Sequence, residues 1–584
     1  MQKSGKHSWL RYYMLSVGFL AFFSLIVRPG LELKAGWNRI WIAIDIIIIA
    51  SFISNIILRF IWATKKKEFI RRNAFELVVL FIFIAQFLIT LLFMNRPEIR
   101  AAIHQLGIVS LTKIYIVLAQ VYILIELLAQ LGKINSKIAT LPLPPSLLFM
   151  GSFIVVILTG TILLMLPGAT KHGISLIDAL FTATSATCVT GLIVVPTGTF
   201  FTRYGHTVIL LLIQIGGLGL MTFATFSALI LRGELGIKER VMLGDVLNLR
   251  VMNKIKSLLG AIIGFTFTLE LIGAIALYFA TGRYASLQDG RLYFSIFHSV
   301  SAFCNAGFSL WNQNLLPFVN NTLGSITVMA LIVLGGIGFV VLADWWAYIK
   351  EPWRLKKLAR PHLSLHSKFV MTITAALIVV GALLFFILEY DGQLAPLSIG
   401  YKWLASFFQA ITPRTAGFNT LDTSAFAPAT LFMLMVFMFI GASPGSTGGG
   451  IKTTTFGVLA LMVFSRLRGD SDMKLFGRSI PSATAQRAGM VLFLSLIVVS
   501  SGLFFLLIFE QGKTLLQLLF EEISAFGTVG LSTGITSSLS VGGKIIIILT
   551  MFLGRIGPLT FLTSIMFRKR RGQIKYPDEN IMIG

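Results

Sequence analysis

The feature that most restricts the fold is a pattern that occurs four times after residue 145. A long apolar run is followed by a short piece that ends at a glycine, and then by a second long apolar run. The long runs reach about 20 residues, the length that a helix needs to cross the ~30 Å hydrocarbon core of a bilayer. The short pieces, such as DALFTATSA, are too short to cross it as helices. We therefore expect each short piece to enter the membrane and return to the same side.

Hydropathy and charge place the whole chain in a membrane. Of its 584 residues 56% are hydrophobic and only 12% are charged, which is typical of a polytopic membrane protein. Lys and Arg number 49 against 24 for Asp and Glu, but they gather in the loops on one side of the spans. By the positive-inside rule these loops and both termini face the cytosol, across the cytoplasmic membrane. The same distribution explains the basic excess without a nucleic-acid partner. The basic loops are 65–72, 232–256, 350–368, 466–487 and 568–575.

Residues 1–140 are expected to form an N-terminal extension of four spans, at about 9–27, 40–62, 75–94 and 109–131. No small-residue cleavage site follows the first run, so we interpret it as a retained span. The fourth run lacks the regular arginines of a voltage sensor, which favours a packing or dimer-forming bundle. Inside these spans an unpaired carboxylate costs about 2.5–3.5 kcal/mol, so pairing with Lys113 or another base is expected. The carboxylates concerned are Asp45, Glu76 and Glu126.

Enzyme and metal chemistry have no support in the sequence. The two cysteines give neither a disulfide framework nor metal-ligand spacing, and the seven histidines are scattered. Neither a nucleophile–base pair, an HExxH motif nor paired aspartates on the spans are found. We expect no enzyme activity and no covalent cofactor.

Two glycine positions keep their spacing through the four units. Successive loop glycines are separated by 116, 110 and 113 residues, and each is followed 24 to 28 residues later by a glycine in the closing span. This regularity indicates four structural repeats. The loop glycines are Gly191, Gly307, Gly417 and Gly530, and the closing-span glycines are Gly216, Gly335, Gly441 and Gly554.

The short pieces therefore predict an ion pathway. Uncoiled backbone survives at membrane depth only where it is buried in protein or lines water, and four copies around a pseudo-fourfold axis satisfy both conditions. Their carbonyl oxygens could replace the hydration shell of a cation such as K⁺. The preceding short helices would aim their partly negative C-terminal ends at the same axis. The expected filter residues are Thr187, Cys188, Val189, Thr190, Gly191, Cys304, Asn305, Ala306, Gly307, Thr415, Ala416, Gly417, Thr528, Val529 and Gly530.

From about residue 146 to its end, roughly three quarters of its length, the chain resembles the Trk/Ktr/HKT superfamily of potassium transporters. The resemblance rests on DALFTATSATCVTGL, FHSVSAFCNAGFSL, FQAITPRTAGFNTLDTSAF, GASPGSTGGGIKTTT, FEEISAFGTVGLSTGIT and IKYPDENIMIG. The third and fourth loops and the tail are most similar to the Ktr membrane subunit, whereas the first 140 residues do not match.

This resemblance implies one K⁺ pathway per chain, a homodimer and a separate cytosolic nucleotide-binding regulatory subunit. A glycine in the first loop goes with K⁺ preference in this superfamily, while a serine there goes with Na⁺ in some plant relatives. The residue here is Gly191.

The expected fold is an all-α polytopic membrane protein of twelve spans, with four membrane–pore-loop–membrane repeats around a pseudo-fourfold pore. The repeats are assigned to residues 146–232, 257–349, 368–466 and 487–584, the last including a cytosolic tail.

The third closing span is interrupted by a glycine-rich run that cannot be a continuous helix. We interpret this run as an intramembrane gate, and the resemblance also implies a gate. The alternative is a passive kink. A phosphate-binding loop is excluded because the GxxxxGK[ST] spacing fails. Arg555 lies inside the last span, where a cation needs water or a carbonyl. We place it beneath the filter; the alternative is a structural salt bridge. The expected gate residues are Gly441, Ser443, Gly445, Ser446, Thr447, Gly448, Gly449, Gly450, Lys452 and Arg555.

Other residues near the loops are interpreted one by one, and two of them keep an alternative. Capping and the helix dipole explain Asp178, whereas Glu270 is either an ion relay or a structural partner. Arg414 either repels cations or ties down a loop carboxylate. Asn305 is expected to brace its loop, and Cys188 and Cys304 to be small residues behind the filter. Two carboxylates are also placed on the fourth pore helix, Glu521 and Glu522.

The predicted function is K⁺ uptake across the cytoplasmic membrane. The alternatives are a Na⁺ transporter or a Na⁺-coupled K⁺ symporter, because the filter alone does not state the coupling. An organic-solute carrier is disfavoured, since it would more naturally have two inverted halves.

Overall fold

The computed structural model describes residues 37–62, 66, 145–230, 255–283, 290–350, 363–470 and 472–565, with scattered positions between 13 and 31. The chain divides into two compact units. One contains Met1–Pro142 with Met165–Gly173, and the other contains Leu143–Leu164 with Ile174–Gly584.

In the first unit the described elements are α2 (Trp37–Trp62), η1 (Phe23–Val27), η2 (Arg28–Gly30) and η3 (Pro167–Ala169). Asp45 of α2 accepts a hydrogen bond from Ser24 (2.6 Å) and forms an ion pair with Arg28 (2.7 Å). The expected partner for this carboxylate is therefore present, and it is an arginine. Glu76, Lys113 and Glu126 lie outside the described residues.

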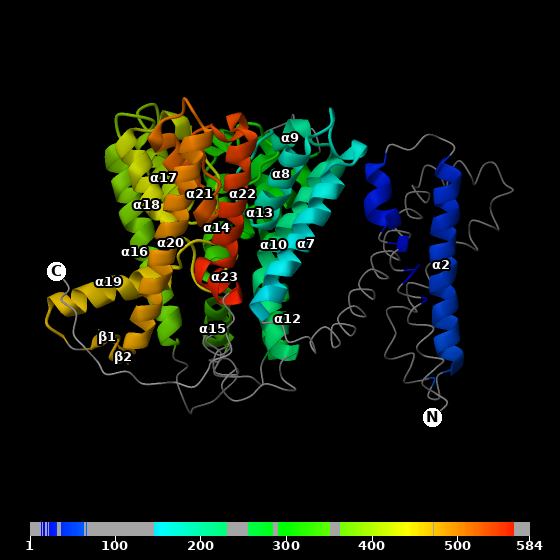
Figure 1. Cartoon of the computed structure of the whole chain (residues 1–584), viewed down its shortest axis with the longest axis horizontal. Helices are drawn as coiled ribbons and strands as arrows, with labels where there is room; N and C mark the ends of the chain where they lie inside the picture. The colour runs from blue at the N-terminus through cyan, green and yellow to red at the C-terminus, as the bar shows by residue number, and fades with distance from the viewer. Residues whose placement is uncertain are drawn as a thin grey trace. The chain divides into compact units, whose positions relative to one another are not determined.

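The second unit contains four consecutive groups of helices, and each group has a long opening helix, a short pore helix and a closing segment (Figure 1). The first and second groups are α7 (Pro145–Leu164), α8 (Leu176–Thr187), α9 (Thr197–Phe200), α10 (Arg203–Ile230), α12 (Ile255–Ala280), η6 (Thr281–Arg283), α13 (Arg291–Phe303), η7 (Leu316–Phe318), α14 (Thr322–Ile337) and α15 (Phe339–Lys350). The third and fourth are α16 (Leu365–Leu388), α17 (Ile399–Ile411), η9 (Thr423–Ala425), α18 (Pro428–Phe439), α19 (Thr453–Leu467), β1 (Met473–Leu475), β2 (Arg478–Ile480), α20 (Ser482–Phe509), α21 (Leu515–Gly527), η10 (Thr536–Ser538), α22 (Val541–Ile556) and α23 (Pro558–Ile565).

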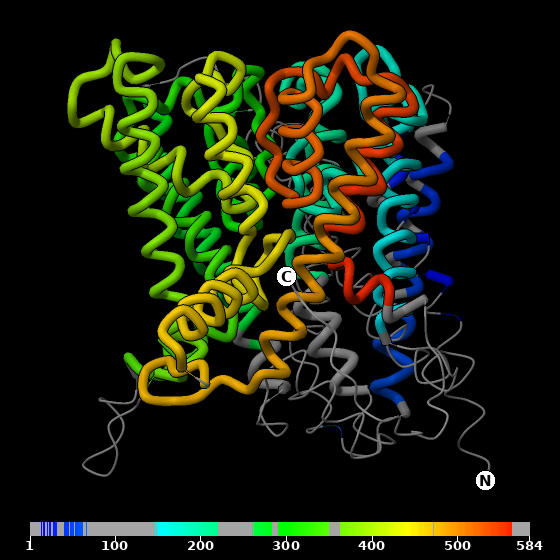
Figure 2. The backbone as a smooth tube through the Cα atoms, turned by 60° about the vertical axis from the view of Figure 1, so that its left-hand side comes forward, coloured from blue at the N-terminus to red at the C-terminus, as the bar shows by residue number. Residues whose placement is uncertain are grey.

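The pore helices α8, α13, α17 and α21 have 12 or 13 residues, about 18–20 Å at 1.5 Å per residue, so they are too short to cross a bilayer. Figure 2 shows α17 and α21 in the upper half of this unit, while α16 and α20 run through its full height. Three described segments are long and apolar enough to span a membrane: Ile262–Ala280, Leu365–Leu388 and Ser482–Phe509. The structure is thus a helical membrane fold with pore-loop repeats. The count of twelve spans stays a prediction, because much of the N-terminal region lies outside the described residues.

Two closing spans that were expected to be continuous are broken. Gly338, with φ of 101°, separates α14 from α15, and these two helices are bent by 101°. Gly557, with φ of 88°, separates α22 from α23 in the fourth repeat. Glycine is the residue that adopts such a φ without a Cβ penalty, so each break lies where the sequence allows it.

A small correction to the purely helical expectation lies in the basic segment 466–487. Strands β1 and β2 form an antiparallel hairpin there. Its two turn residues, Phe476 and Gly477, both have positive φ (47° and 74°), as a type I′ turn requires.

The closing-span glycines have a packing reason. A Cβ at Gly216, Gly335 or Gly554 would overlap the carbonyl oxygen of Thr187, Phe303 or Phe526 respectively. Each of these carbonyls lies four residues before a loop glycine, at or next to the end of a pore helix. The similar spacing of the two glycines therefore reflects close backbone contact between the closing helix and the pore helix in repeats 1, 2 and 4.

We expect Gly216→Ala to lower the thermal unfolding temperature, because overpacking against backbone costs about 1–3 kcal/mol. Gly264→Ala on α12 is the matched control, since a Cβ there meets nothing within 4 Å and alanine favours helix. Unfolding of the detergent-solubilised protein, followed by intrinsic fluorescence, measures both. Equal unfolding temperatures for the two variants would contradict this packing.

Candidate ion pathway

Three of the pore helices end in the same well-formed hydrogen-bonded cap. In the first repeat the Thr190 amide donates to the Ser185 carbonyl (2.8 Å) and the Val189 amide to the Ala186 carbonyl (3.2 Å), the two bonds of a Schellman motif. The same pair of bonds follows α13, at Ala306 and Asn305, and follows α21, at Val529 and Thr528. The segment TSATCVTGL therefore ends a helix with its terminal backbone groups satisfied. The helix continues through Thr187 and is then fully capped.

The residue two positions before each loop glycine has left-handed backbone in all four repeats. These residues are Val189 (φ 58°), Asn305 (60°), Thr415 (70°) and Thr528 (50°). Three of the four are β-branched, and such residues rarely adopt positive φ; the cost is about 1–3 kcal/mol each. Because the loop glycines also have positive φ, between 70° and 93°, two left-handed residues flank one other residue in every loop. The four loops thus share a single, strained backbone conformation.

The four loop glycines close a ring. A Cβ added at Gly191 would lie 3.0 Å from the Cα of Gly307, and one at Gly307 would lie 3.2 Å from the Cα of Gly417. The corresponding distances are 3.0 Å from Gly417 to Gly530 and 3.0 Å from Gly530 back to Gly191. The loops follow one another in chain order around a common axis, and bare backbone packs against backbone at every step.

The carbonyl before each loop glycine is buried, and the described residues give it no hydrogen-bond donor. In the part of the chain that the structure describes, none of these four oxygens accepts a hydrogen bond, although all four residues are fully buried. Each oxygen is also the atom nearest to the glycine of the neighbouring loop. Buried backbone carbonyls are otherwise nearly always paired with protein or water. The ring therefore offers oxygen ligands to a cation or to water, from Thr190, Ala306, Ala416 and Val529.

Hydroxyl groups from the pore-helix ends hold each loop from behind. Ser185 accepts from the Gly191 amide (3.0 Å) and Ser524 from the Gly530 amide (3.1 Å). In the other two repeats Ser301 donates to the Phe308 carbonyl, and Thr412 donates to the Phe418 carbonyl. The hydroxyl-rich composition of these segments thus supports the backbone, a role that the sequence analysis did not assign to these four residues.

The glycine-rich run between α18 and α19 lies across the ends of two closing helices. The Ser443 amide donates to the Gly336 carbonyl (3.0 Å), and the Gly445 carbonyl accepts from the Phe339 amide (2.9 Å). On the fourth repeat the Gly450 amide donates to the Gly554 carbonyl (3.4 Å). Repeats 2 and 4 are opposite in the ring, so the run spans the region between them. In Figure 1, α19 then leads away across the direction of the long helices.

The same run also contacts the loops. The Gly449 amide donates to Thr528 Oγ1 (3.0 Å), and a Cβ at Gly448 would overlap the Thr415 side chain. The expected gate residues therefore lie directly against the left-handed residues of loops 3 and 4. Lys452 Nζ donates back to the Gly448 carbonyl (2.6 Å).

Arg555 is buried and bonds to carbonyl oxygens. It donates to the Thr447 carbonyl of the glycine-rich run and to the Gly216 carbonyl of α10. A carboxylate partner is not found for Arg555 among the described residues, so the salt-bridge alternative does not hold there. The guanidinium ties the run to the closing helix of the first repeat.

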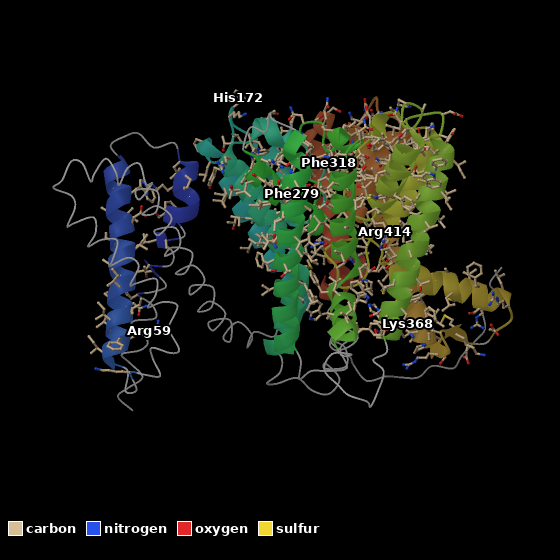
Figure 3. All side chains as sticks on the ribbon, turned by 180° about the vertical axis from the view of Figure 1, so that it is seen from behind. Arg59, His172, Phe279, Phe318, Lys368 and Arg414 are labelled. Carbon is tan, nitrogen blue, oxygen red and sulfur yellow. The ribbon has the colours of Figure 1, made fainter. Side chains whose placement is uncertain are left out.

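The remaining candidates are buried residues in or next to the loops. Cys304 is fully buried, 3.8 Å from Glu270 Oε1, and Asn305 lies 3.3 Å from Thr415 Oγ1. Arg414, labelled in Figure 3 at about mid-height of the helices, donates to Thr374 on α16 (3.3 Å), and the described residues supply it with no carboxylate.

The carboxylates of Asp178 and of the two glutamates of α21 are bound by other side chains of the protein. The Asp178 amide is capped by Ser175, and its carboxylate forms an ion pair with Lys544 of α22 (2.6 Å), which joins the fourth repeat to the first. Glu521 accepts from Ser532 (2.8 Å) and from Thr536, and Glu522 accepts from Thr550 (2.9 Å).

Comparison with known proteins agrees with this arrangement. The family described as TrkH, cation transport protein, matches residues 146–574. Ktr system potassium uptake protein B of Bacillus subtilis (strain 168) is 45% identical over 443 residues, which cover 76% of this chain and 97% of that protein. Potassium/sodium uptake protein NtpJ of Enterococcus hirae is 38% identical over 450 residues, covering 76% and 98%. The crystal structure of the potassium transporter TrkH from Vibrio parahaemolyticus matches with a TM-score of 0.59 at 18% identity, covering 83% of this chain and 96% of that one. At this identity the structural match concerns the fold alone.

We expect Arg555→Met to speed amide hydrogen exchange in residues 443–450 by about tenfold or more, because hydrogen bonds to a charged donor are worth about 1.5–3 kcal/mol each. Exchange mass spectrometry measures this directly. Arg468→Met, at an exposed position beyond α19, is the control and should leave the segment unchanged. Unchanged exchange in Arg555→Met would mean that the run is held without the guanidinium.

Proposed function

The chain belongs to the TrkH family of cation transport proteins, and we propose that it takes up K⁺ across the cytoplasmic membrane, with both termini in the cytosol. Homologues at 45% and 37% identity are named potassium uptake proteins of the Ktr system. They are transporters by name, and we assign transport without an enzymatic step to this chain.

The observation that carries the proposal is the ring of four buried carbonyls, at Thr190, Ala306, Ala416 and Val529, for which the described part of the chain supplies no hydrogen-bond donor. A dehydrated K⁺ would take the place of the missing donors, and the carbonyls would replace its hydration shell. The pore helices add the partial negative charge of their C-terminal ends beside the loops. The expected filter residues, 187–191, 304–307, 415–417 and 528–530, would form this site, with glycine required where the backbones touch.

The glycine-rich run 441–452 would act as the gate. It lies between closing helices of opposite repeats and against loops 3 and 4, so an ion leaving the ring would meet it. Arg555 would keep it in place and would lower cation occupancy beneath the ring electrostatically.

We further propose that two chains form a homodimer and that a separate cytosolic nucleotide-binding subunit regulates the gate. The support is the naming of the relatives as members of a Ktr system, together with the sequence resemblance. Repeats at 146–232, 257–349, 368–466 and 487–584 would form one pathway in each chain.

Na⁺ is the second candidate ion, because one relative is named a potassium/sodium uptake protein. Gly191 in the first loop favours K⁺, since the resemblance associates serine at this position with Na⁺. Uptake of Rb⁺ and Na⁺ by proteoliposomes separates the two candidates, and equal uptake of both would exclude K⁺ selectivity.

We expect Gly191→Ser to weaken K⁺ over Na⁺ discrimination, because its Cβ would lie 2.5 Å from the Ala306 carbonyl and push loop 2 out of the ring. Gly512→Ser is the matched control. Its φ of 95° is nearly that of Gly191 (92°), but a Cβ there meets nothing within 4 Å. Proteoliposome uptake of Rb⁺ with competing Na⁺ measures both variants. Unchanged K⁺ over Na⁺ discrimination in Gly191→Ser would show that this glycine is not part of the filter.

Shortening the run from Gly445 to Gly450 should raise flux in the absence of any regulator, because a shorter segment cannot span the closing helices of repeats 2 and 4. Rb⁺ uptake by proteoliposomes, compared with the parent protein and with protein-free liposomes, measures the change. Equal flux would support a passive bend in place of a gate.

A further inference from the structure

The outer part of loop 3 is held by the segment that follows loop 2. Asn314 Nδ2 donates to the Gly417 carbonyl (3.3 Å), and the Leu315 amide donates to the Asn419 carbonyl (3.1 Å). Both bonds cross from the second repeat to the third. Gly417 is therefore distinct among the loop glycines. Within the described ranges the carbonyls of Gly191, Gly307 and Gly530 accept no hydrogen bond.

Asn314 is itself fixed in place. It has left-handed backbone (φ 53°), which asparagine tolerates better than most residues. Its carbonyl accepts a hydrogen bond from Ser309 Oγ (3.3 Å), while the Trp311 amide donates to the same hydroxyl (3.1 Å). The amide nitrogen of Asn314 is thus presented to Gly417 by a turn whose centre is Ser309.

His298 on the pore helix α13 supports that turn. It is fully buried, and its Nε2 lies 3.0 Å from Ser309 Oγ and accepts from the Leu310 amide (3.3 Å). A backbone amide can only donate, so Nε2 is unprotonated and Nδ1 carries the proton that goes to the Phe294 carbonyl (2.9 Å). The Phe294 ring lies against the imidazole, with centroids 3.8 Å apart. The single Ser309 hydroxyl proton goes to the Asn314 carbonyl, so His298 holds this turn through the Leu310 amide. A neutral, oriented histidine therefore anchors the turn that carries Asn314 to Gly417.

Among the described residues, the corresponding positions in the other repeats do not make this inter-repeat connection. The residue nine positions before the loop glycine is Glu521 in repeat 4, and its carboxylate bonds to Ser532 and Thr536 of its own repeat. In repeat 1 it is Thr182, which donates back to the Asp178 carbonyl of its own helix (2.8 Å). In repeat 3 it is Phe408, which has no polar atom. Loop 3 thus lacks a polar support from its own pore helix at this level and takes one from repeat 2.

We propose that Asn314, held by Ser309 and His298, is a positioning residue that fixes the Gly417 carbonyl at the outer end of the ring. The proposal rests on the K⁺ uptake function proposed above. Without the amide donor the Gly417 peptide can rotate, and an ion site that depends on fixed carbonyl geometry loses affinity and selectivity. The arrangement makes the third loop's contribution depend on a side chain from the second repeat.

The test uses the full chain in proteoliposomes and measures Rb⁺ uptake against K⁺ concentration, with and without Na⁺. Asn314→Gly removes the donor and keeps a residue that tolerates positive φ. We expect the half-saturating K⁺ concentration to rise about two- to tenfold, the equivalent of one net hydrogen bond, with more inhibition by Na⁺ and little change in maximal rate. His298→Leu should have the same effect, and the double variant should add little to it because the two act in one chain.

Two controls separate this effect from general destabilisation. Gln313→Ala changes the adjacent exposed residue, for which no side-chain contact with loop 3 is found in the described part of the chain. His298→Gln keeps an acceptor for the Leu310 amide and should restore part of the K⁺ affinity lost in His298→Leu. If the parent protein is K⁺-selective and Asn314→Gly matches it in half-saturation and Na⁺ inhibition, the positioning role is wrong. If the parent protein itself transports neither Rb⁺ nor K⁺, the proposed function fails instead.

Discussion

Close packing of four strained backbone loops, with no side chain between them, is the constraint on which the second unit depends. Each loop glycine touches the next, and a Cβ at any of them would meet a neighbouring carbonyl oxygen or Cα. Positive φ at Val189, Thr415 and Thr528 adds local strain that only surrounding contacts can hold. The capped pore-helix ends and the hydroxyls behind the loops supply those contacts. The result is a set of buried carbonyls whose missing partners define a place for a cation.

The helices around the ring also pack through direct backbone contacts. Closing helices carry glycine where they pass the ends of pore helices in repeats 1, 2 and 4. In repeat 3 this pattern fails, because Gly441 packs against Gly449 of the glycine-rich run. Amides of that run also donate to carbonyls near the ends of α14 and α22. Both helices break three residues after their closing-span glycines Gly335 and Gly554, at Gly338 and Gly557. The helix breaks and the interrupted span are therefore one structural arrangement.

Much of this arrangement follows from patterns that are local or periodic. Apolar run lengths indicated the membrane class, and the spacing of Gly191, Gly307, Gly417 and Gly530 predicted four loops that the structure brings together. The placement of Arg555 against carbonyl oxygens followed from the energetics of a buried cation. The breaks at Gly338 and Gly557 were not predicted, because a glycine inside an apolar run is also compatible with a continuous helix. The hairpin at 473–480 was missed because its strands have only three residues each.

The sequence by itself determined the class of fold, the number of repeats and the positions where only glycine fits, since these depend on chain length, hydropathy and the absence of a Cβ. Only the tertiary structure decided which atoms meet. The bond from Asn314 to Gly417 joins residues 103 positions apart, and the bond from Arg555 to Gly216 joins residues 339 apart. Such contacts follow no local period, because they arise when separate repeats are packed around one axis. The sequence therefore predicted a ring of loops, and the packing between repeats decided how each loop is held.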